Sequence, residues 1–393
     1  MAFVTPAGVF RRRDLVSCDG WLDKVSQWIG DEQYEDVGVD VPGLEVVDLK
    51  KSFLRKEKGK KGKRKRKEIV HALNGVSFTA ERGQIYGLLG PNACGKSTTM
   101  KCIGSINAAD SGTIRVFGVD VSKQPYKARQ MFGYVHQDAG VDKILTGREH
   151  LDLFADLAHV DTARKEQNTE DLITALRMEN FIDLETGVYS GGIKRRLDIA
   201  LAMVHQPGLL LLDEPTTGLD VESRAIIWDL LREFRGNGGC VLLTSHYLEE
   251  VDTLADVVGI MDKGSLIASG TTAELKASLG GTRVQIRIEE FTSQTEAERA
   301  LEHLKAKGAI RQGLINPGLG NALELVIPAN RDTSDAVEIL LRDAGFESMF
   351  SVSKSRMSLG DVYLTATGRS LQDADRIAQA ARDPKQTKSE QIL

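Results

Sequence analysis

The residues between Gly90 and Thr98 have the types and the spacing that phosphate binding requires. The segment reads GPNACGKST, in which a glycine, four residues and Gly-Lys-Ser form the phosphate-loop pattern. It lies between an apolar run of strand length and a predicted helix, so its backbone N–H groups can surround phosphate oxygens. We expect Lys96 to reach the β- and γ-phosphates of a nucleotide and the Ser97 hydroxyl to bind Mg²⁺. The alternative is a glycine-rich turn that binds nothing.

Two carboxylates follow a short apolar run further along the chain. Residues 209–212 are all leucine, and Asp213-Glu214-Pro215 comes next. This order is typical of a buried parallel strand whose carboxyl end faces a site. We expect Asp213 to bind Mg²⁺ and Glu214 to orient an attacking water. The alternative is a solvated acidic turn.

A second glycine pair and a histidine add to these groups. Ser190-Gly191-Gly192 opens a predicted helix, where backbone donors can bind an anion, although Ser-Gly-Gly alone is more often a plain turn. Another apolar strand, residues 241–244, ends at Ser245-His246. A lone histidine after a strand is usually structural, but His246 falls where a sensor of the γ-phosphate is needed.

Taken together, residues 44–277 resemble the nucleotide-binding subunit of an ATP-binding-cassette (ABC) transporter. Six motifs occur in the order of that family: Walker A (Gly90 to Thr98), the Q-loop glutamine (Gln137), the signature (Ser190 to Gly192), Walker B (Leu209 to Glu214), the D-loop (Asp220) and the switch histidine (His246). The resemblance implies an α/β P-loop NTPase fold of the RecA-like type, with a helical subdomain at about residues 143–200. Residues 142–151 and 189–202 look like the daunorubicin-resistance type of exporter.

The family resemblance also implies how the residues act. Two copies pack head to tail and hold two ATP molecules, each between Walker A of one copy and the signature of the other. Gln137 then binds Mg²⁺ and links the site to a membrane partner, and Phe53 stacks on adenine, for which ordinary strand packing is the alternative. The implied catalytic residues are Glu214, His246 and Lys96; the implied Mg²⁺ ligands are Ser97, Gln137 and Asp213; and the other ATP-binding residues are Phe53, Gly90, Asn92, Ala93, Cys94, Gly95, Thr98, Ser190, Gly191, Gly192 and Asp220.

Some positions depart from the family pattern. Ala93-Cys94 replaces the usual Gly-Ala, but these positions contribute backbone N–H groups, so side chains that point away are tolerated. A helix N-terminus and a lysine lower a thiol pKa, so Cys94 is either redox-sensitive or an inert cysteine. The signature has Tyr189 in place of leucine and Ile193 in place of glutamine. Because Glu214 and His246 are both present, we expect two equivalent, hydrolysis-competent sites in a homodimer.

The remaining sequence predicts further parts around the cassette. Residues 1–43 contain a short amphipathic helix at residues 21–30 that suits a membrane interface, a protein groove or its own domain. Residues 278–369 follow the order β-α-β-β-α-β of a ferredoxin-like α+β domain, for dimerisation, regulation or packing on the cassette, and residues 370–393 form a polar tail. Residues 55–68 hold ten basic residues and no apolar one, which predicts either a solubilising loop or attraction to an anionic membrane surface.

Composition limits the location and the partners. No apolar run approaches the ~18 residues of a membrane helix, and no secretory signal is recognisable. The four cysteines lack Cys-x-x-Cys spacing, which favours a reducing cytosol. We therefore expect a peripheral ATPase at the cytoplasmic face of the plasma membrane, bound to a separate transmembrane permease. The alternative is a soluble cassette ATPase acting on nucleic acid or ribosomes, but a single Walker A and the absence of sustained heptads make nucleic acid the less favoured partner.

Overall fold

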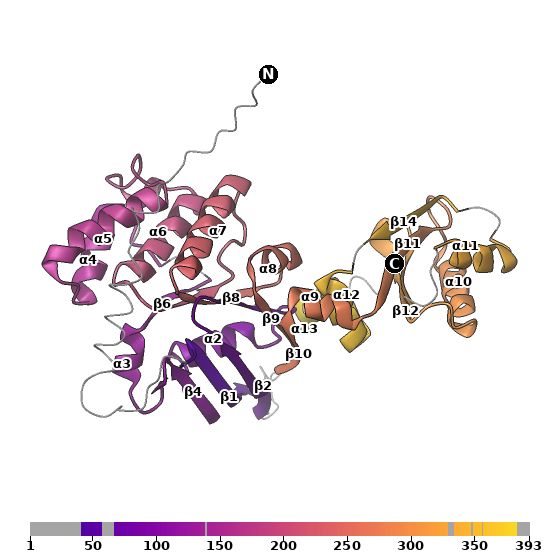
Figure 1. Cartoon of the computed structure of the whole chain (residues 1–393), viewed down its shortest axis with the longest axis horizontal. Coiled ribbons are helices and arrows are strands. Elements are labelled where there is room, and N and C mark those ends of the chain that lie inside the picture. Colours follow the sequence, from indigo (N-terminus) through magenta and orange to yellow (C-terminus); the bar gives the residue numbers. More distant parts are fainter. Residues whose placement is uncertain are drawn as a thin grey trace, which may run out of the picture. The chain divides into compact units, whose positions relative to one another are not determined.

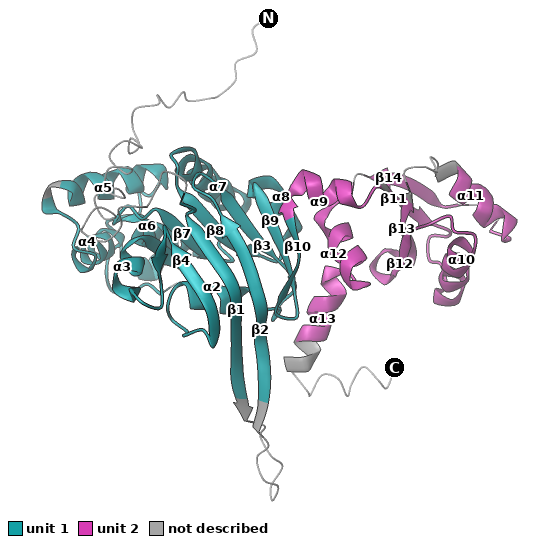
Figure 2. Cartoon of the chain, turned by 60° about the horizontal axis from the view of Figure 1, so that its bottom comes forward, with its two compact units in different colours: residues 1–269 teal, residues 270–393 magenta. Residues whose placement is uncertain are grey.

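A computed structural model describes residues 41–56, 67–137, 140–328, 334–346, 349–355 and 357–382. It divides the chain into unit 1, Met1–Ser269, and unit 2, Gly270–Leu393, which Figure 2 colours separately. The predicted amphipathic helix at residues 21–30 and the basic residues 57–66 lie outside the described residues. The predicted domain boundary after residue 277 differs from this division, because α9 (Thr272–Ser278) belongs to unit 2.

A six-stranded sheet forms the centre of unit 1. Its strand order is β10 (Ser265–Thr271), β9 (Val257–Asp262), β3 (Ile85–Leu89), β8 (Cys240–Ser245), β7 (Leu209–Asp213) and β6 (Phe132–Val135). The pairs β6–β7, β7–β8, β3–β8 and β3–β9 are parallel. Every residue of β3, β7 and β8 is buried, which explains their continuous apolar sequences. The carboxyl ends of these strands therefore lie along one edge of the sheet.

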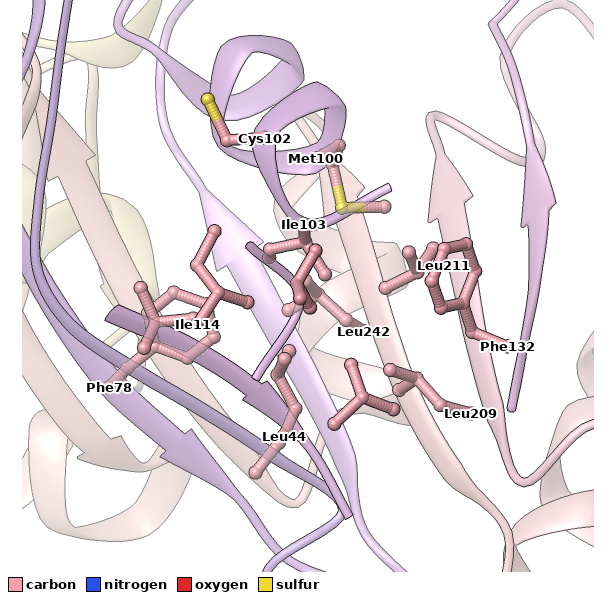
Figure 3. Packing of buried hydrophobic residues seen from close by; sticks show 14 of the residues in the cluster. Leu44, Phe78, Met100, Cys102, Ile103, Ile114, Phe132, Leu209, Leu211 and Leu242 are labelled. Atoms are coloured by element: carbon pink, nitrogen blue, oxygen red, sulfur yellow. The ribbon is translucent and has the colours of Figure 1, made fainter. Parts of the chain in front are cut away.

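A second, antiparallel sheet of unit 1 has the order β2 (Lys67–Ala80), β1 (Leu44–Lys56), β4 (Ser111–Val116) and β5 (Val119–Asp120). Strands β1 and β2 pair along their whole lengths, and Figure 2 shows this hairpin extending beyond the other strands of the unit. Helix α2 (Lys96–Ile103) packs its Met100 and Ile103 into the core that joins the two sheets (Figure 3). Burial of each such side chain contributes about 1.5–3 kcal/mol, which fixes the helix behind the phosphate loop.

Helices α4 (Gly147–Leu157), α5 (Thr162–Ala175), α6 (Gly191–Met203) and α7 (Val221–Gly236) are grouped together in unit 1 (Figure 1). Three of them begin at side-chain caps, since Thr146, Ser190 and Asp220 each accept a hydrogen bond from a backbone N–H of the following turn. The shorter helices are α3 (Pro125–Gln130), α8 (Leu248–Leu254) and the 3₁₀ turn η1 (Thr186–Val188). Helices α4 and α5 lie within the region, about residues 143–200, for which the sequence predicts a helical subdomain.

Unit 2 contains a four-stranded antiparallel sheet with its own core. The strand order is β12 (Gln312–Asn316), β13 (Ala322–Pro328), β11 (Gly281–Arg287) and β14 (Ser351–Ser355). Helices α10 (Gln294–Ala306) and α11 (Ser334–Asp343) follow β11 and β13 along the chain, and η2 (Pro317–Leu319) joins β12 to β13. This is the element order predicted for the region, while its assignment as ferredoxin-like stays a prediction.

Two helices close the described part of unit 2. Helix α12 (Leu359–Thr367) buries Asp361, whose carboxylate lies 3.5 Å from Arg283 on β11. Helix α13 (Leu371–Arg382) occupies a segment for which the sequence predicts a polar tail. These twelve residues form a helix in which Leu371 and Ala374 recur on one face and are buried, while the polar tail stays a prediction. Among the described helices, none has the length and apolar character needed to cross a membrane.

Candidate functional site

The predicted site residues of unit 1 gather at the carboxyl edge of the six-stranded sheet. Strand β3 leads into the phosphate loop, β6 is followed by Gln137 two residues later, β7 ends at Asp213 and β8 is followed by His246. Loops at this edge are brought together because the four strands run parallel and in register. Segments that are up to 156 residues apart in sequence, from Gly90 to His246, thus meet.

The phosphate loop is a closed turn around its own lysine. Lys96 is only 4% exposed, and its Nζ donates hydrogen bonds to the carbonyl oxygens of Gly90 at 2.6 Å and Pro91 at 3.1 Å. Gly95 has φ 118°, and a Cβ there would lie 2.9 Å from the Ala72 carbonyl oxygen, so the position requires glycine. The backbone is therefore wound tightly at the start of α2, with the ammonium already oriented along the loop.

The other predicted loop residues occupy the same turn. Asn92 and Ala93 form its tip, with φ 62° at Ala93, and Thr98 lies in the first turn of α2. Cys94 is buried, and burial raises the pKa of its thiol even though the Lys96 charge acts to lower it. A neutral, buried thiol favours the inert role for Cys94 over the redox-sensitive one.

Asp213 and Ser97 form an oxygen-rich pair next to the phosphate loop. The Ser97 hydroxyl donates to Oδ1 of Asp213 at 3.1 Å, and the Thr244 hydroxyl donates to the same oxygen at 2.6 Å. Mg²⁺ in nucleotide sites is held by one or two protein oxygens, waters and phosphate oxygens. One carboxylate and one hydroxyl side by side therefore fit the predicted Mg²⁺ ligands, and the role of Thr244 was not predicted from the sequence.

Two predicted residues, Gln137 and His246, converge on Glu214. Its Oε1 lies 3.1 Å from Nδ1 of His246, and its Oε2 accepts from Nε2 of Gln137 and from the Thr217 hydroxyl, each at 3.4 Å. Its backbone N–H donates to both the carbonyl and the hydroxyl of Thr244. Glu214 has φ 48°, a left-handed conformation that is costly for this residue type, so the neighbouring contacts hold the carboxylate in place.

The charge state of Glu214 follows from the same contacts. Burial acts to raise its pKa, but the hydrogen bond and charge of His246 and the charge of Lys96 outweigh burial, and the pKa is lowered. The side chain is therefore a carboxylate at neutral pH, an acceptor that can hold a water by its proton.

The signature segment is arranged differently from the phosphate loop. Ser190 and Gly191 are exposed, and a Cβ at Gly191 would meet no atom within 4 Å. Gly192 instead packs against Ser223 at the start of α7, where Asp220 accepts hydrogen bonds from the N–H and hydroxyl of Ser223. The signature thus has one packed side and one open side.

Tyr189 and Phe53 have different surroundings. Tyr189, which replaces the family leucine, donates its hydroxyl to the Phe181 carbonyl oxygen at 2.6 Å and so anchors the signature loop. Phe53 is 40% exposed on β1, opposite Val70 in the register, and Lys51 Nζ lies 5.4 Å from its ring centroid. Strand packing therefore leaves part of this residue exposed, and its stacking on adenine stays a prediction.

Comparison with known proteins gives consistent matches. The family model described as ABC transporter matches residues 73–217. The daunorubicin/doxorubicin resistance ATP-binding protein DrrA of Streptomyces peucetius is 39% identical over 77% of this chain and 90% of that protein. The linearmycin resistance ATP-binding protein LnrL of Bacillus subtilis is 33% identical over 77% and 95% of the two chains. The Nod factor export ATP-binding protein I of Burkholderia lata is 32% identical over 77% and 93%.

Solved structures agree at the level of the fold. The ATP-binding subunit of an ABC transporter aligns with TM-score 0.52 and 28% identity over 60% of this chain and 92% of that one. The cbiO1 protein of Clostridium perfringens, part of an ABC transporter complex, aligns with TM-score 0.51 and 26% identity over 61% and 91%.

Proposed function

The chain belongs to the ABC transporter family as an ATP-binding and ATP-hydrolysing subunit of the drug-resistance exporter type, and from this premise we propose how its residues perform that work. ATP binds at the phosphate loop, and two copies of the chain close on two ATP molecules. Hydrolysis reopens the pair, and a separate membrane permease converts this cycle into transport. The alternative of a soluble ATPase acting on nucleic acid or ribosomes is not favoured, since the similar proteins are named for resistance and export.

The observation that carries this proposal is the convergence of Gln137 and His246 on the Glu214 carboxylate. In the proposed reaction Glu214 accepts a hydrogen bond from the attacking water, and His246 orients Glu214 and contacts the γ-phosphate. Lys96 neutralises charge on the β- and γ-phosphates. Mg²⁺ bound by Ser97, Asp213 and Gln137 would supply further charge neutralisation.

We further propose that the signature acts on the ATP of the partner copy. The exposed side of Ser190 and Gly191 supports this arrangement, because none of the residues that the structure describes places an atom within 4 Å of a Cβ at Gly191. A helix N-terminus with free backbone donors is favourable next to a γ-phosphate. The two sites of a symmetric dimer would then be equivalent.

The proposed location is the cytoplasmic face of the plasma membrane, where the chain is held by its permease. The basic run at residues 55–68 supports an additional attraction to anionic lipid headgroups, worth about 1 kcal/mol for each basic residue near the surface. Export is the proposed direction, because relatives are named for Nod factor export and for antibiotic resistance.

Purification of the native complex in mild detergent, with ATPase assays of the wild type and Glu214→Gln, tests the main proposal. We expect a stoichiometric polytopic membrane protein to co-purify, and ATP turnover to fall on the order of 100-fold in Glu214→Gln with nucleotide binding retained. Co-purification of nucleic acid or ribosomes without a membrane protein would refute the transport role.

Mixing two inactive variants tests the trans arrangement. Lys96→Ala disables the phosphate loop, and Gly191→Asp places a negative charge on the open side of the signature. A mixed dimer then contains one site with both motifs intact, so random pairing should restore about a quarter of wild-type activity. No recovery from mixed dimers that form and bind ATP would contradict the trans role.

A further inference from the structure

The buried side chain of Arg195, on α6, donates hydrogen bonds to four backbone carbonyl groups. Nε donates to Pro215 at 2.8 Å, and Nη2 donates to Asp213 at 2.9 Å and to Glu214 at 3.2 Å. Nη1 donates to the carbonyl of His136, the residue before Gln137. One guanidinium thus joins the signature helix to the segment after β7 and to the segment after β6.

Asp198, one turn further along α6, lies beside Arg195. Its carboxylate lies 4.0 Å from Nη1 of Arg195, and the backbone N–H of Gly140 acts to lower its pKa. The contact observed next to Gln137 is therefore the one from Arg195 to the carbonyl of His136. This contact is independent of the glutamine side chain itself.

Only arginine has the donors for this arrangement. A guanidinium carries five N–H groups in a fixed planar fork, and hydrogen bonds from a charged donor are about twice as strong as neutral ones. Lysine has a single ammonium group and could reach one part of this set. Four carbonyl groups on two segments of the chain are consequently held by one rigid guanidinium group.

We propose that Arg195 is a positioning residue that couples the signature helix to Gln137 and Glu214. Ser190, at the N-terminus of α6, lies five residues before Arg195, so a shift of the helix on contact with a partner's nucleotide moves the carbonyls that hold the hydrolytic groups. The inference rests on the ATPase activity proposed above, and it adds a route by which one site senses the other. Arg195 contacts no nucleotide in this scheme.

The matched control is Arg196, the next residue of the same helix. It is equally buried, but its donors reach the Ser223 hydroxyl at 3.0 Å and the carbonyls of Leu176 and Arg177. Replacing either arginine with glutamine removes one buried guanidinium from α6. Only Arg195→Gln removes the contacts to the segments that carry Gln137 and Glu214.

The experiment compares kcat and KM for ATP with Mg²⁺ in the full-length chain, normalised to the fraction that binds nucleotide. We expect Arg195→Gln to lower kcat about tenfold to a hundredfold with KM changed less than about threefold, since misplacing a reacting group by about 1 Å has such a cost. Arg195→Lys should be intermediate, and it carries the test if Arg195→Gln does not fold. An unchanged kcat per nucleotide-binding chain in the folded variant would overturn the proposal.

A double-mutant cycle separates positioning from general destabilisation. In a Gln137→Ala background the loss caused by Arg195→Gln should shrink, because part of it acts through Gln137, whereas the loss caused by Arg196→Gln should be the same in both backgrounds. Equal losses from Arg195→Gln in both backgrounds would overturn the coupling to Gln137.

Hydrogen exchange gives a second readout that does not depend on activity. The peptide containing Gln137 should exchange faster in Arg195→Gln and not in Arg196→Gln. Failure of the wild type to hydrolyse ATP in a Glu214-dependent way would refute the proposed function, while unchanged exchange in Arg195→Gln would refute the role of Arg195.

Discussion

The two glycine-containing segments of unit 1, Gly90 to Ser97 before α2 and Ser190 to Gly192 before α6, both precede a helix but have different surroundings. The first is closed on itself, with Lys96 bonded to two loop carbonyls and Gly95 packed against the Ala72 carbonyl. The second has an exposed serine and an open space in front of Gly191. Both place backbone donors at a helix N-terminus, but only the first is complete within one chain.

The two segments therefore depend on different contacts in order to bind nucleotide. A closed loop has its binding geometry before ligand arrives, so its residues are fixed by contacts within unit 1. An open helix N-terminus is held from behind, through side chains of α6 that reach Ser223, β7 and the segment after β6. The first segment is therefore expected to lose activity when its own side chains, such as Lys96, are removed. The second is expected to lose activity when the side chains of α6 that hold it in place, such as Arg195, are removed.

The largest effect is expected from removing the lysine of the closed loop. Lys96→Ala should lower ATP turnover about 10²–10³-fold and weaken nucleotide binding, because it removes the charge next to the phosphates. Lys194→Ala, which removes a lysine just after the second segment, should leave nucleotide affinity of the chain unchanged. Fluorescent nucleotide titration measures the nucleotide affinity of both variants, and equal losses of affinity would show that the two segments are equivalent within one chain.

A methyl group on a packed glycine should cost about 1–3 kcal/mol of unfolding free energy. Gly95→Ala is strained by φ 118° and by the Ala72 carbonyl oxygen, and Gly192→Ala overlaps the Ser223 side chain. Denaturant unfolding of the two variants gives the comparison directly. Stability equal to the wild type in Gly192→Ala would mean that α6 and α7 separate easily, contrary to the support inferred for the open segment.

The stability of the folded chain should depend on pH through Asp198 on α6. Burial raises the pKa of the Asp198 carboxyl to about 6, against the opposing effects of Arg195 and Gly140. The folded protein therefore binds this proton more tightly than the unfolded chain, and stability falls as the pH rises through about 6. Between about pH 5 and pH 7.5 the wild type should lose about 1 kcal/mol relative to Asp198→Asn. Parallel stability curves for the two proteins would contradict this prediction.

The smallest effect on stability is expected at the open glycine. Gly191→Ala should change the unfolding free energy by less than about 0.5 kcal/mol, because its Cβ meets nothing and alanine is tolerated in a helix. ATP turnover of the dimer should nevertheless fall, since the methyl group points into the space proposed for the partner's ATP. Unaltered turnover in this variant would remove the reason for treating the two segments differently.

Much of the site was predictable because its chemistry is local in sequence. The pattern from Gly90 to Ser97 specifies a strand, a loop and a helix, and a leucine run before Asp213-Glu214 specifies a buried strand with an acidic end. The hydrogen bond from Thr244 to Asp213 was not predicted, since a threonine in a strand is common for its β-branched shape alone. Helix α13 was missed because a short amphipathic segment rich in charges is polar on average.

The sequence by itself determined the family, the motifs and the residue types of the site, because spacing along the chain fixes loops and helix starts. Tertiary structure alone decided that Arg195 faces four carbonyls, that one side of the signature is packed and the other open, and that burial keeps the Cys94 thiol neutral. The physical reason is that carbonyl oxygens are present in every residue and carry no sequence signal. Which of them a buried side chain meets depends on how strands far apart in the chain are brought side by side.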